Sequence, residues 1–474
     1  MTNTATPRSL ALDTLAGVSR GKYGNIAVDT VLRRTSLSEP DRHLFTALVY
    51  GVLERQVTLD FLIDQFSDRP TESLDETLRL ALRMGLYQLI YMDRIPDHAA
   101  VGETVALLPK RTRGYANAIL RSYLRFEASL PPHAPRENKL DSPEGWLERF
   151  PVLSDPSVIR RGFTPETVFL GMPLPMLETF IRAQGREGAL SCLSAMADKP
   201  PLTLRVNTLR TTPEALAKQL TAEGLSVECG LYLPTALRVW NSGDVTRLPG
   251  FDSGDFFVQD EASQLCVAVL DAQPGDLVID TCACPGSKSF GTGIHMKNKG
   301  HIYAFDLHES KLSLIETGAE RLGLTTISVA RRDAREPDQT LLGRADRVLC
   351  DVPCSGLGVM SKKPELRHKD LSESARLPGI QAAILSACAG YVKEGGVLVY
   401  STCTLLPEEN EMIIRDFLQQ HPDFTPLEFH IPAQHPSLPS VTSDHGMITL
   451  RPDNNNTDGF FIAKLLKGPV QEAL

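Results

Sequence analysis

The spacing of apolar residues divides the chain into regions with different periodicities. From residue 8 to about 128, apolar side chains recur every three or four positions, as at Leu78, Leu82, Leu86 and Leu89. This spacing places apolar side chains along one face of an α-helix. The pattern therefore predicts a bundle of amphipathic helices over the first part of the chain.

The proline-rich stretch PPHAPREN at 131–138 interrupts the helical pattern and predicts a linker. Beyond it, the segment from about 174 to 250 mixes helical spacing with short strand-like runs, LTLRVNTL at 202–209 and LRVWN at 237–241. Runs of this length and composition are typical of strands. We therefore expect a small α/β subdomain after the helical bundle.

After about residue 255, short apolar runs alternate with helical segments, which is typical of a parallel sheet with crossover helices. The predicted strands are 277–280, 302–306, 327–333, 347–351 and 397–403, and the predicted helices are 308–323, 372–392 and 408–420. The predicted architecture is multidomain. It has an all-α bundle at 1–135, a small α/β subdomain at 165–250 and an α/β Rossmann-like domain at 251–474.

Composition narrows the class of protein. At 474 residues the chain exceeds what one hydrophobic core usually organises, which agrees with several domains. A hydrophobic content of 42%, a mean hydropathy of −0.12 and the lack of a long apolar run argue against a membrane protein. The N-terminal segment has no secretion-signal pattern, so we expect a cytoplasmic location.

The cysteine content indicates reduced thiols. Nine cysteines, an odd number without regular spacing, argue against a disulfide scaffold. Cys282 and Cys284 have no second close Cys or Cys/His pair that would complete a zinc site, so no bound metal is expected. Five further cysteines are expected to pack in cores: Cys192, Cys229, Cys266, Cys350 and Cys388.

The net charge of −9 argues against binding to nucleic acid, because phosphate contacts usually dominate such affinity. Local basic groups nevertheless occur at 110–113, 331–332, 362–363 and 367–369. A local positive field is sufficient to hold a nucleic-acid backbone. Each group taken alone is also compatible with ordinary solvated surface charge.

Four predicted strands end in an aspartate, at Asp280, Asp306, Asp333 and Asp351. The carboxyl ends of parallel strands meet along one edge of a sheet, where ligands bind in open α/β folds. We therefore expect these acids to line a common crevice. The alternative is that each aspartate only caps the helix or turn that follows it.

The loop TCACPGSKSFGTG at 281–293 follows the first predicted strand and is rich in glycine and small residues. An acid about 25 residues later, Asp306, is suited to bind the hydroxyls of a ribose. The loop matches neither the dinucleotide nor the P-loop phosphate fingerprint, which favours a nucleoside cofactor without a pyrophosphate. S-adenosylmethionine fits this pattern better than NAD.

Two cysteines follow neighbouring strands, Cys354 in DVPCSG and Cys403 in STC. We expect both thiols to lie over the same crevice. Such a pair suits methylation at carbon 5 of a cytosine, where one thiolate adds to carbon 6 and the other group assists release. Lys288 is expected to favour the thiolate, and Asp351 to hydrogen-bond the base. The residues alone do not say which cysteine is the nucleophile.

The motifs DTCACPGSK, DVPCSGLGV and YSTCTLLPEEN together resemble those of the RNA 5-methylcytosine methyltransferases. The resemblance extends through RVNTLR at 205–210, VQDEASQL at 258–265 and TDGFFIAKL at 457–465. The first domain, with DRHLFTALVYGVLER and YANAILRSYL, is similar to the helical RNA-binding domain of the antitermination factor NusB.

The resemblance implies an S-adenosylmethionine-dependent enzyme that acts on a cytosine of small-subunit (16S) ribosomal RNA. We expect it to be a monomer. The resemblance implies that Cys403 is the nucleophile and that Cys354 promotes release. It also places Asp306 on the ribose, Asp333 near the adenine and Asp351 close to the methyl group. The implied cofactor loop consists of Cys282, Ala283, Cys284, Pro285, Gly286, Ser287 and Lys288.

The cofactor loop departs from the family's usual CAAPGGKT at Cys284, Ser287 and Ser289. If the turn requires a positive φ at Ser287, the side chain adds a strain of roughly 1–2 kcal/mol. Two other functions are compatible with the sequence. One is a non-catalytic RNA-binding adaptor, and the other is an S-adenosylmethionine enzyme with another target, such as an amine, which needs no thiol pair.

Overall fold

The computed structural model describes residues 5–130, 142–197 and 200–469, so the predicted linker at 131–138 lies outside the described residues. The chain divides into two compact units. One contains Met1–Ala197 together with Met360–Lys369, and the other contains Asp198–Val359 and Asp370–Leu474. The three domain ranges given above remain a prediction.

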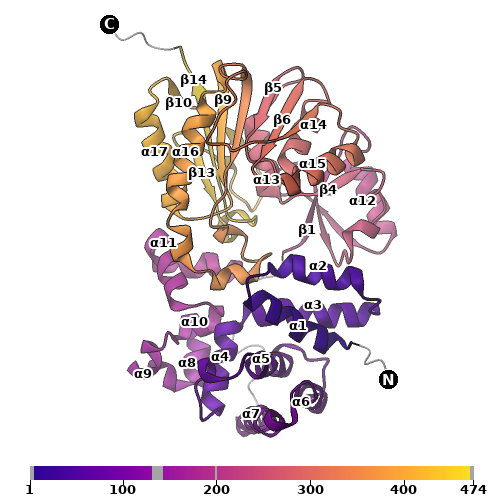
Figure 1. Cartoon of the computed structure of the whole chain (residues 1–474), viewed down its shortest axis with the longest axis vertical. Coiled ribbons are helices and arrows are strands. Elements are labelled where there is room, and N and C mark those ends of the chain that lie inside the picture. The colour runs from indigo at the N-terminus through magenta and orange to yellow at the C-terminus, as the bar shows by residue number, and fades with distance from the viewer. Residues whose placement is uncertain (1–4, 131–141, 198–199, 470–474) are drawn as a thin grey trace. The chain divides into compact units, whose positions relative to one another are not determined.

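The first unit is helical, as the apolar spacing predicted. Its helices are α1 (Pro7–Ser19), α2 (Gly24–Arg34), α3 (Glu39–Glu54), α4 (Gln56–Phe66), α5 (Glu76–Tyr91), α6 (Asp97–Ala106), α7 (Lys110–Ser129), α8 (Pro143–Arg149), α9 (Pro156–Arg160), α10 (Pro165–Leu170) and α11 (Leu174–Ala195) (Figure 1). The start of α5 follows local capping chemistry, since the Asp75 side chain accepts from the backbone N–H groups of Thr77 and Leu78. No helix among the described residues is long and apolar enough to cross a membrane.

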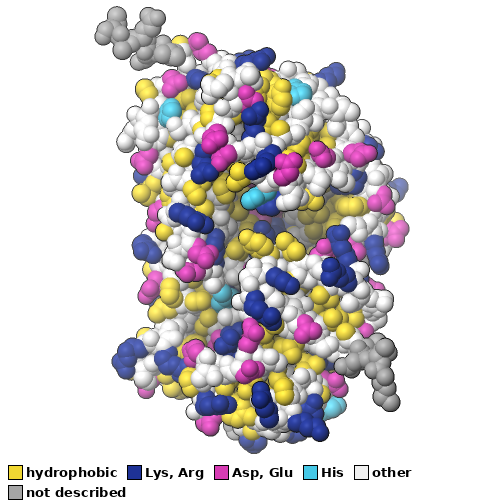
Figure 2. Space-filling model, in the orientation of Figure 1, with side chains coloured by type: hydrophobic (Ala, Val, Ile, Leu, Met, Phe, Trp, Pro, Cys, Tyr) yellow, Lys and Arg dark blue, Asp and Glu magenta, His cyan; other side chains and the backbone are white. Residues whose placement is uncertain are grey.

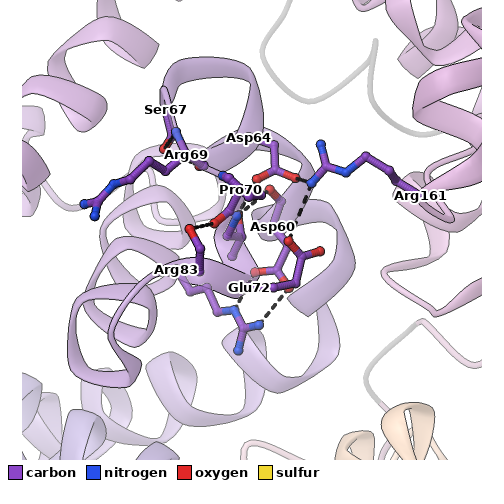
Figure 3. A network of polar contacts seen from close by, with 10 residues as sticks. Asp60, Asp64, Ser67, Arg69, Pro70, Glu72, Arg83 and Arg161 are labelled. Atoms are coloured by element: carbon purple, nitrogen blue, oxygen red, sulfur yellow. Dashed lines mark hydrogen bonds and ion pairs between the residues drawn. The ribbon is translucent and has the colours of Figure 1, made fainter.

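Ion pairs cross-link the helices of this unit around α4 (Figure 3). The guanidinium of Arg83 on α5 donates two hydrogen bonds of 2.7 Å to the carboxylate of Asp60 on α4. Asp64, one turn further on, pairs with Arg161, which lies just after α9, and accepts the backbone N–H of Thr71 at 2.7 Å. The bidentate geometry at Arg83 gives this pair directional strength as well as charge attraction.

The segment 360–369 belongs to the helical unit although it lies far along the chain. Arg367 is 1% exposed, and its guanidinium donates to the carbonyl oxygens of Leu170 and Met196 at 2.9 and 3.1 Å. His368 bonds the carbonyl of Leu53 at 3.0 Å, and burial lowers its pKa to about 4, so the ring is neutral at neutral pH. The proposal of a basic surface at 367–369 is therefore wrong for these two side chains.

The second unit contains two main sheets. The smaller is antiparallel with order β2-β3-β1-β4 and is covered by α12 (Pro213–Ala222). Its strands are β1 (Leu202–Val206), β2 (Ser226–Cys229), β3 (Ala236–Trp240) and β4 (Phe256–Val258). The expected α/β subdomain is thus present, and the two runs singled out in the sequence form β1 and β3.

The larger sheet has the order β10-β14-β9-β8-β5-β6-β7, with β13 beside β14. Its strands are β5 (Leu277–Asp280), β6 (His301–Asp306), β7 (Ile327–Arg331), β8 (Ala345–Asp351), β9 (Val392–Thr402), β10 (Phe424–Pro426), β13 (Met447–Leu450) and β14 (Phe460–Lys467). Strands β5 to β9 pair in parallel, whereas β14 pairs antiparallel with β9. The mixed sheet confirms the Rossmann-like α/β class.

Helices cover both faces of this sheet (Figure 1). One face packs against α16 (Leu377–Ala389) and α17 (Glu411–Gln420), with Ile279 and Leu398 in the shared core. The other face packs against α13 (Glu261–Leu270), α14 (Ser287–His295) and α15 (Glu309–Leu322). Val278 and Val399, which are adjacent in sequence to Ile279 and Leu398, are buried on this face. Successive residues of a strand point to opposite faces, so strands buried on both sides have continuous apolar runs.

The pairing of Arg83 with Asp60 generates a stability prediction. Replacing Arg83 with Ala leaves the Asp60 carboxylate without its cation inside the helical unit, which we expect to cost about 3 kcal/mol. Hydrogen exchange of α4 and α5 amides, followed by mass spectrometry, measures the change. Arg20→Ala is the control, because Arg20 is 4.0 Å from Glu76 on the surface and should have little effect. Equal exchange in both variants would contradict the role given to the buried pair.

Candidate active site

Cys354 and Cys403 meet beyond the carboxyl ends of β8 and β9. These strands are parallel neighbours, with Asp351 paired to Ser401 at their ends. The two Sγ atoms lie 3.3 Å apart, and both side chains are half-buried. The prediction that the two thiols share one position at the sheet edge is confirmed.

Close approach of three backbone segments brings the thiols together. The N–H of Gly358 donates to the carbonyl of Cys403, and the N–H of Gly459 donates to the carbonyl of Gly358, both at 2.9 Å. A Cβ at Gly358 would lie only 2.0 Å from the carbonyl oxygen of Gly459. Glycine is therefore required where the Cys354 loop, the end of β9 and the start of β14 cross.

Side-chain hydrogen bonds reinforce this contact. The hydroxyls of Ser355 and Thr404, the residues directly after the two cysteines, lie 2.7 Å apart. The backbone N–H of Ser355 donates to the carboxylate of Glu409 at 2.9 Å. Glu409 is a site residue that was not predicted from the sequence, although it stands in the motif YSTCTLLPEEN.

Lys288 and Asp351 form an ion pair beside the thiols. The Nζ of Lys288 lies 2.6 Å from Oδ2 of Asp351, and the Ser401 hydroxyl donates to Oδ1 at 2.8 Å. Burial disfavours the charged amine, but Asp351 outweighs it and raises the pKa of Lys288 above its ordinary value. The ammonium also lies over the ring of Phe460 at 5.1 Å. The structure thus provides a fixed positive charge next to a carboxylate.

The predicted cofactor loop lies at the carboxyl end of β5 and leads into α14. Gly286 has φ of 107°, whereas Ser287 is the first residue of the helix and is not among the residues with positive φ. The condition for strain at Ser287 is therefore not met, because Gly286 takes the left-handed conformation. The Ser289 hydroxyl donates to Asp280 at 2.6 Å, so this serine supplies a hydroxyl where the family has threonine.

Hydrogen bonds to β6 fix the backbone of the cofactor loop. The N–H of Ala283 donates to the carbonyl of Phe305 at 2.8 Å, and the N–H of Cys284 donates to the carboxylate of Asp306 at 3.2 Å. Cys282 is half-buried and contributes to the core on the α16 side, while Pro285 is exposed. The backbone of the loop is thus fixed next to the strand that carries Asp306.

The strand-end acids are not equivalent. Asp280 is 1% exposed and buried beneath the loop, so the expectation that it lines an open crevice is wrong; burial raises its pKa to about 7. Asp306 is partly exposed and also accepts the N–H of His308 at 2.9 Å. Asp333 lies beyond the end of β7, and hydrogen bonds from Arg335 lower its pKa to about 2.

Of the five cysteines expected in cores, four are buried and one is exposed. Cys192, Cys266, Cys350 and Cys388 are buried, as predicted. Cys229 is exposed, so its placement in a core is wrong. It ends β2, an edge strand of the small sheet, where one side chain face remains open to solvent.

Of the basic groups, the one at 110–113 is on the surface. Lys110 and Arg111 are exposed at the start of α7, and Lys and Arg side chains are interspersed with acids on the face of the helical unit drawn in Figure 2. Arg332 instead pairs with Asp338, and Arg331 donates to the carbonyl of Leu307. On the face of the helical unit drawn in Figure 2, positive side chains are thus mixed with acidic ones.

Comparison with family models divides the chain into three matched parts. Residues 267–466 match the 16S rRNA methyltransferase RsmB/F model, and residues 5–125 match the NusB family. Residues 172–246 match the ferredoxin-like domain of RsmF/B-like methyltransferases. The matched parts include the thiol pair, the cofactor loop, most of the helical bundle and strands β1, β2 and β3 of the small sheet.

Curated relatives are similar along nearly their whole length. A protein of Synechocystis sp. named "Probable ribosomal RNA small subunit methyltransferase B" is 37% identical, over 97% of this chain and 99% of its own length. One of Bacillus subtilis with the same name is 35% identical, over 97% and 98%. Among solved structures, that of PH0851 has a TM-score of 0.74 and 26% identity, covering 97% of this chain and 99% of its own.

The crossing at Gly358 generates the next prediction. Gly358→Ala forces the Cys354 loop away from Gly459, and we expect it to lower the melting temperature by several degrees and to separate the two thiols. Differential scanning calorimetry and cross-linking by a short bifunctional thiol reagent measure these effects. Gly379→Ala is the control, because a Cβ at Gly379 meets no atom within 4 Å. An unchanged melting temperature and cross-link in Gly358→Ala would refute the steric argument.

Proposed function

The chain belongs to the 16S rRNA methyltransferase RsmB/F family, and we propose that it methylates carbon 5 of a cytosine through a covalent bond to Cys403. S-adenosylmethionine is the methyl donor of this family of enzymes. The observation that carries the proposal is the 3.3 Å contact between the sulfurs of Cys354 and Cys403. Methyl transfer to an amine or a hydroxyl has no use for two adjacent thiols.

The residues at the sheet edge fit S-adenosylmethionine. Asp306, fixed by the N–H groups of Cys284 and His308, keeps lone pairs on both oxygens for two ribose hydroxyls. The carboxylate of Asp351 suits a position near the positive sulfonium. Asp333 is the candidate for the adenine, and its pairing with Arg335 fixes its direction. When bound, the cofactor supplies an electrophilic methyl group.

The two sulfurs account for the two halves of the reaction. The Cys403 thiolate adds to carbon 6 of the cytosine, forming an S–C bond and making carbon 5 nucleophilic enough to accept the methyl group. Cys354 then takes the proton from carbon 5. The electron pair of that C–H bond restores the double bond between carbons 5 and 6 and expels the Cys403 sulfur.

Asp351 and Lys288 are proposed to hold the base during these steps. A carboxylate accepts a hydrogen bond from the exocyclic amine of cytosine, which distinguishes it from uracil. The ion pair with Lys288 and the bond from Ser401 prevent rotation of the Asp351 side chain. Fixed dipoles and charges of this kind stabilise a developing charge without reorganisation.

The helical unit and the small sheet are proposed to hold the RNA. The exposed Lys110 and Arg111 on α7 suit contacts with the phosphate backbone. The target cytosine has to be single-stranded or flipped out of a helix, because its carbons 5 and 6 are otherwise stacked. A cytoplasmic, monomeric enzyme remains our expectation.

Substitution of each cysteine tests the division of roles. Cys403→Ala removes the attacking sulfur and is expected to abolish methyl transfer. Cys354→Ala leaves attack and transfer intact but removes the base, so we expect a covalent protein–RNA complex that survives a denaturing gel. The assay uses in vitro transcribed small-subunit rRNA with labelled S-adenosylmethionine, and bisulfite sequencing locates the product.

Two outcomes would contradict the assignment. Full methylation by Cys403→Ala would favour another target atom. Turnover by Cys354→Ala at the wild-type rate, with no trapped band, would remove Cys354 from the release step. Cys229→Ala is the matched control, because its thiol is exposed and lies on a different sheet.

A cofactor-binding measurement tests the adaptor alternative. Titration calorimetry of the wild-type protein with S-adenosylhomocysteine is expected to show one site. Asp306→Ala should weaken binding by about ten-fold or more, since two hydrogen bonds to the ribose are lost. Failure of the wild-type protein to bind would support a non-catalytic RNA-binding protein.

A further inference from the structure

Glu409 is a buried carboxylate that the proposed reaction does not use. It is 2% exposed, and its Oε2 accepts from the N–H of Ser355 at 2.9 Å and from the amide of Gln381 at 2.8 Å. The other oxygen, Oε1, is buried and has no hydrogen-bond partner within the described part of the chain. A buried carboxyl oxygen without a partner is costly, so its retention requires a reason.

The hydrogen bonds of Glu409 and Gln381 fix the backbone on both sides of Cys354. Ser355, the next residue, donates directly to the carboxylate. Pro353, the preceding residue, is held by Gln381, whose Nε2 donates both to the Pro353 carbonyl at 3.0 Å and to Glu409. The carboxylate itself comes from the segment that follows Cys403. The backbone on both sides of one cysteine is thus attached to the chain that carries the other.

The charged groups that act on the two sulfurs differ. Lys288, on the Asp351 side of the pair, interacts electrostatically with Cys403. Cys354 instead interacts electrostatically with Cys403, Glu409 and Tyr400, and no cation is among the groups that act on it most strongly. The hydrogen bond with Cys403, burial, and the charges of Cys403 and Glu409 all raise the pKa of the Cys354 thiol.

We propose that Glu409 is the positioning residue that gives the two cysteines different roles. It holds Cys354 against Cys403 and keeps a negative charge on the Cys354 side of the pair. Cys354 therefore retains the shared proton, and Cys403 carries the thiolate that attacks the base. This inference deepens the proposed function and rests on it.

The arrangement also explains how Cys354 becomes a base at the right stage. When the Cys403 sulfur bonds to carbon 6 it loses its negative charge, so two of the contributions that raised the pKa of Cys354 disappear. The Cys354 proton then leaves to solvent, and its thiolate takes the proton from carbon 5. Elimination restores the Cys403 thiolate beside the Cys354 thiol. One proton is released per methyl transferred, as the overall reaction requires.

Alkylation by iodoacetamide across a pH range tests the proposal on the full-length protein without RNA. Mass spectrometry quantifies the modification of each cysteine separately. In the wild-type protein we expect Cys403 to react at lower pH than Cys354. In Glu409→Gln, an amide keeps an acceptor for Ser355 but removes the charge, so the Cys354 profile should move down by about one pH unit, a rate gain of about ten-fold at neutral pH.

Glu408→Gln is the matched control, because the adjacent Glu408 is exposed and its variant should leave both profiles unchanged. A purely structural clamp would leave the Cys354 profile unchanged in folded Glu409→Gln, and that result would overturn the proposal. If Glu409→Gln does not fold, the wild-type protein decides, since reaction of Cys354 before Cys403 is equally damaging. Because no RNA is present, these outcomes are independent of whether bisulfite sequencing finds a methylated cytosine.

Discussion

The candidate site depends on the parallel pairing of β8 with β9. Parallel neighbours end at the same edge of the sheet, so the loops that follow them leave side by side. Pairing alone brings two loops near each other but does not set a 3.3 Å contact between their sulfurs. The additional constraint is the crossing at Gly358 and Gly459, where two backbones meet without a side chain between them. The antiparallel strand β14 contributes to the site for this reason.

Much of this arrangement could be predicted from the sequence because it follows from local patterns. The parallel strands are continuous apolar runs buried on both faces, and β5 begins and ends where its run does. The helical bundle has a clear period, and each cysteine follows a strand. The strand β14 was missed as an element although Asp458-Gly459 before FFIAKLLK is a turn signal, since nothing in the local sequence marks it as an antiparallel neighbour of β9.

Two of the wrong predictions, those for Asp280 and Arg367, share one physical cause. The environments of both side chains are set by segments distant in the chain, which residue type and sequence neighbours do not report. Asp280 is covered by Ser289 of α14, and Arg367 is satisfied by the carbonyls of Leu170 and Met196. A buried polar group is tolerated where donors and acceptors from elsewhere in the fold complete its hydrogen bonds. Nothing in a local motif reports those partners.

The local sequence also does not report which charged groups surround the two cysteines, and these groups affect the chemistry of the thiols. Each follows an apolar strand and precedes a small hydroxyl residue, so their local sequences are nearly equivalent. The difference between them lies in charges brought from other elements: Lys288 from α14 on one side, and Glu409 from the turn after β9 on the other. A thiol and a thiolate 3.3 Å apart share one proton, and a small difference in local potential decides which sulfur holds it. On the proposed division of roles, the asymmetry of this chemically symmetric pair is therefore a property of tertiary structure.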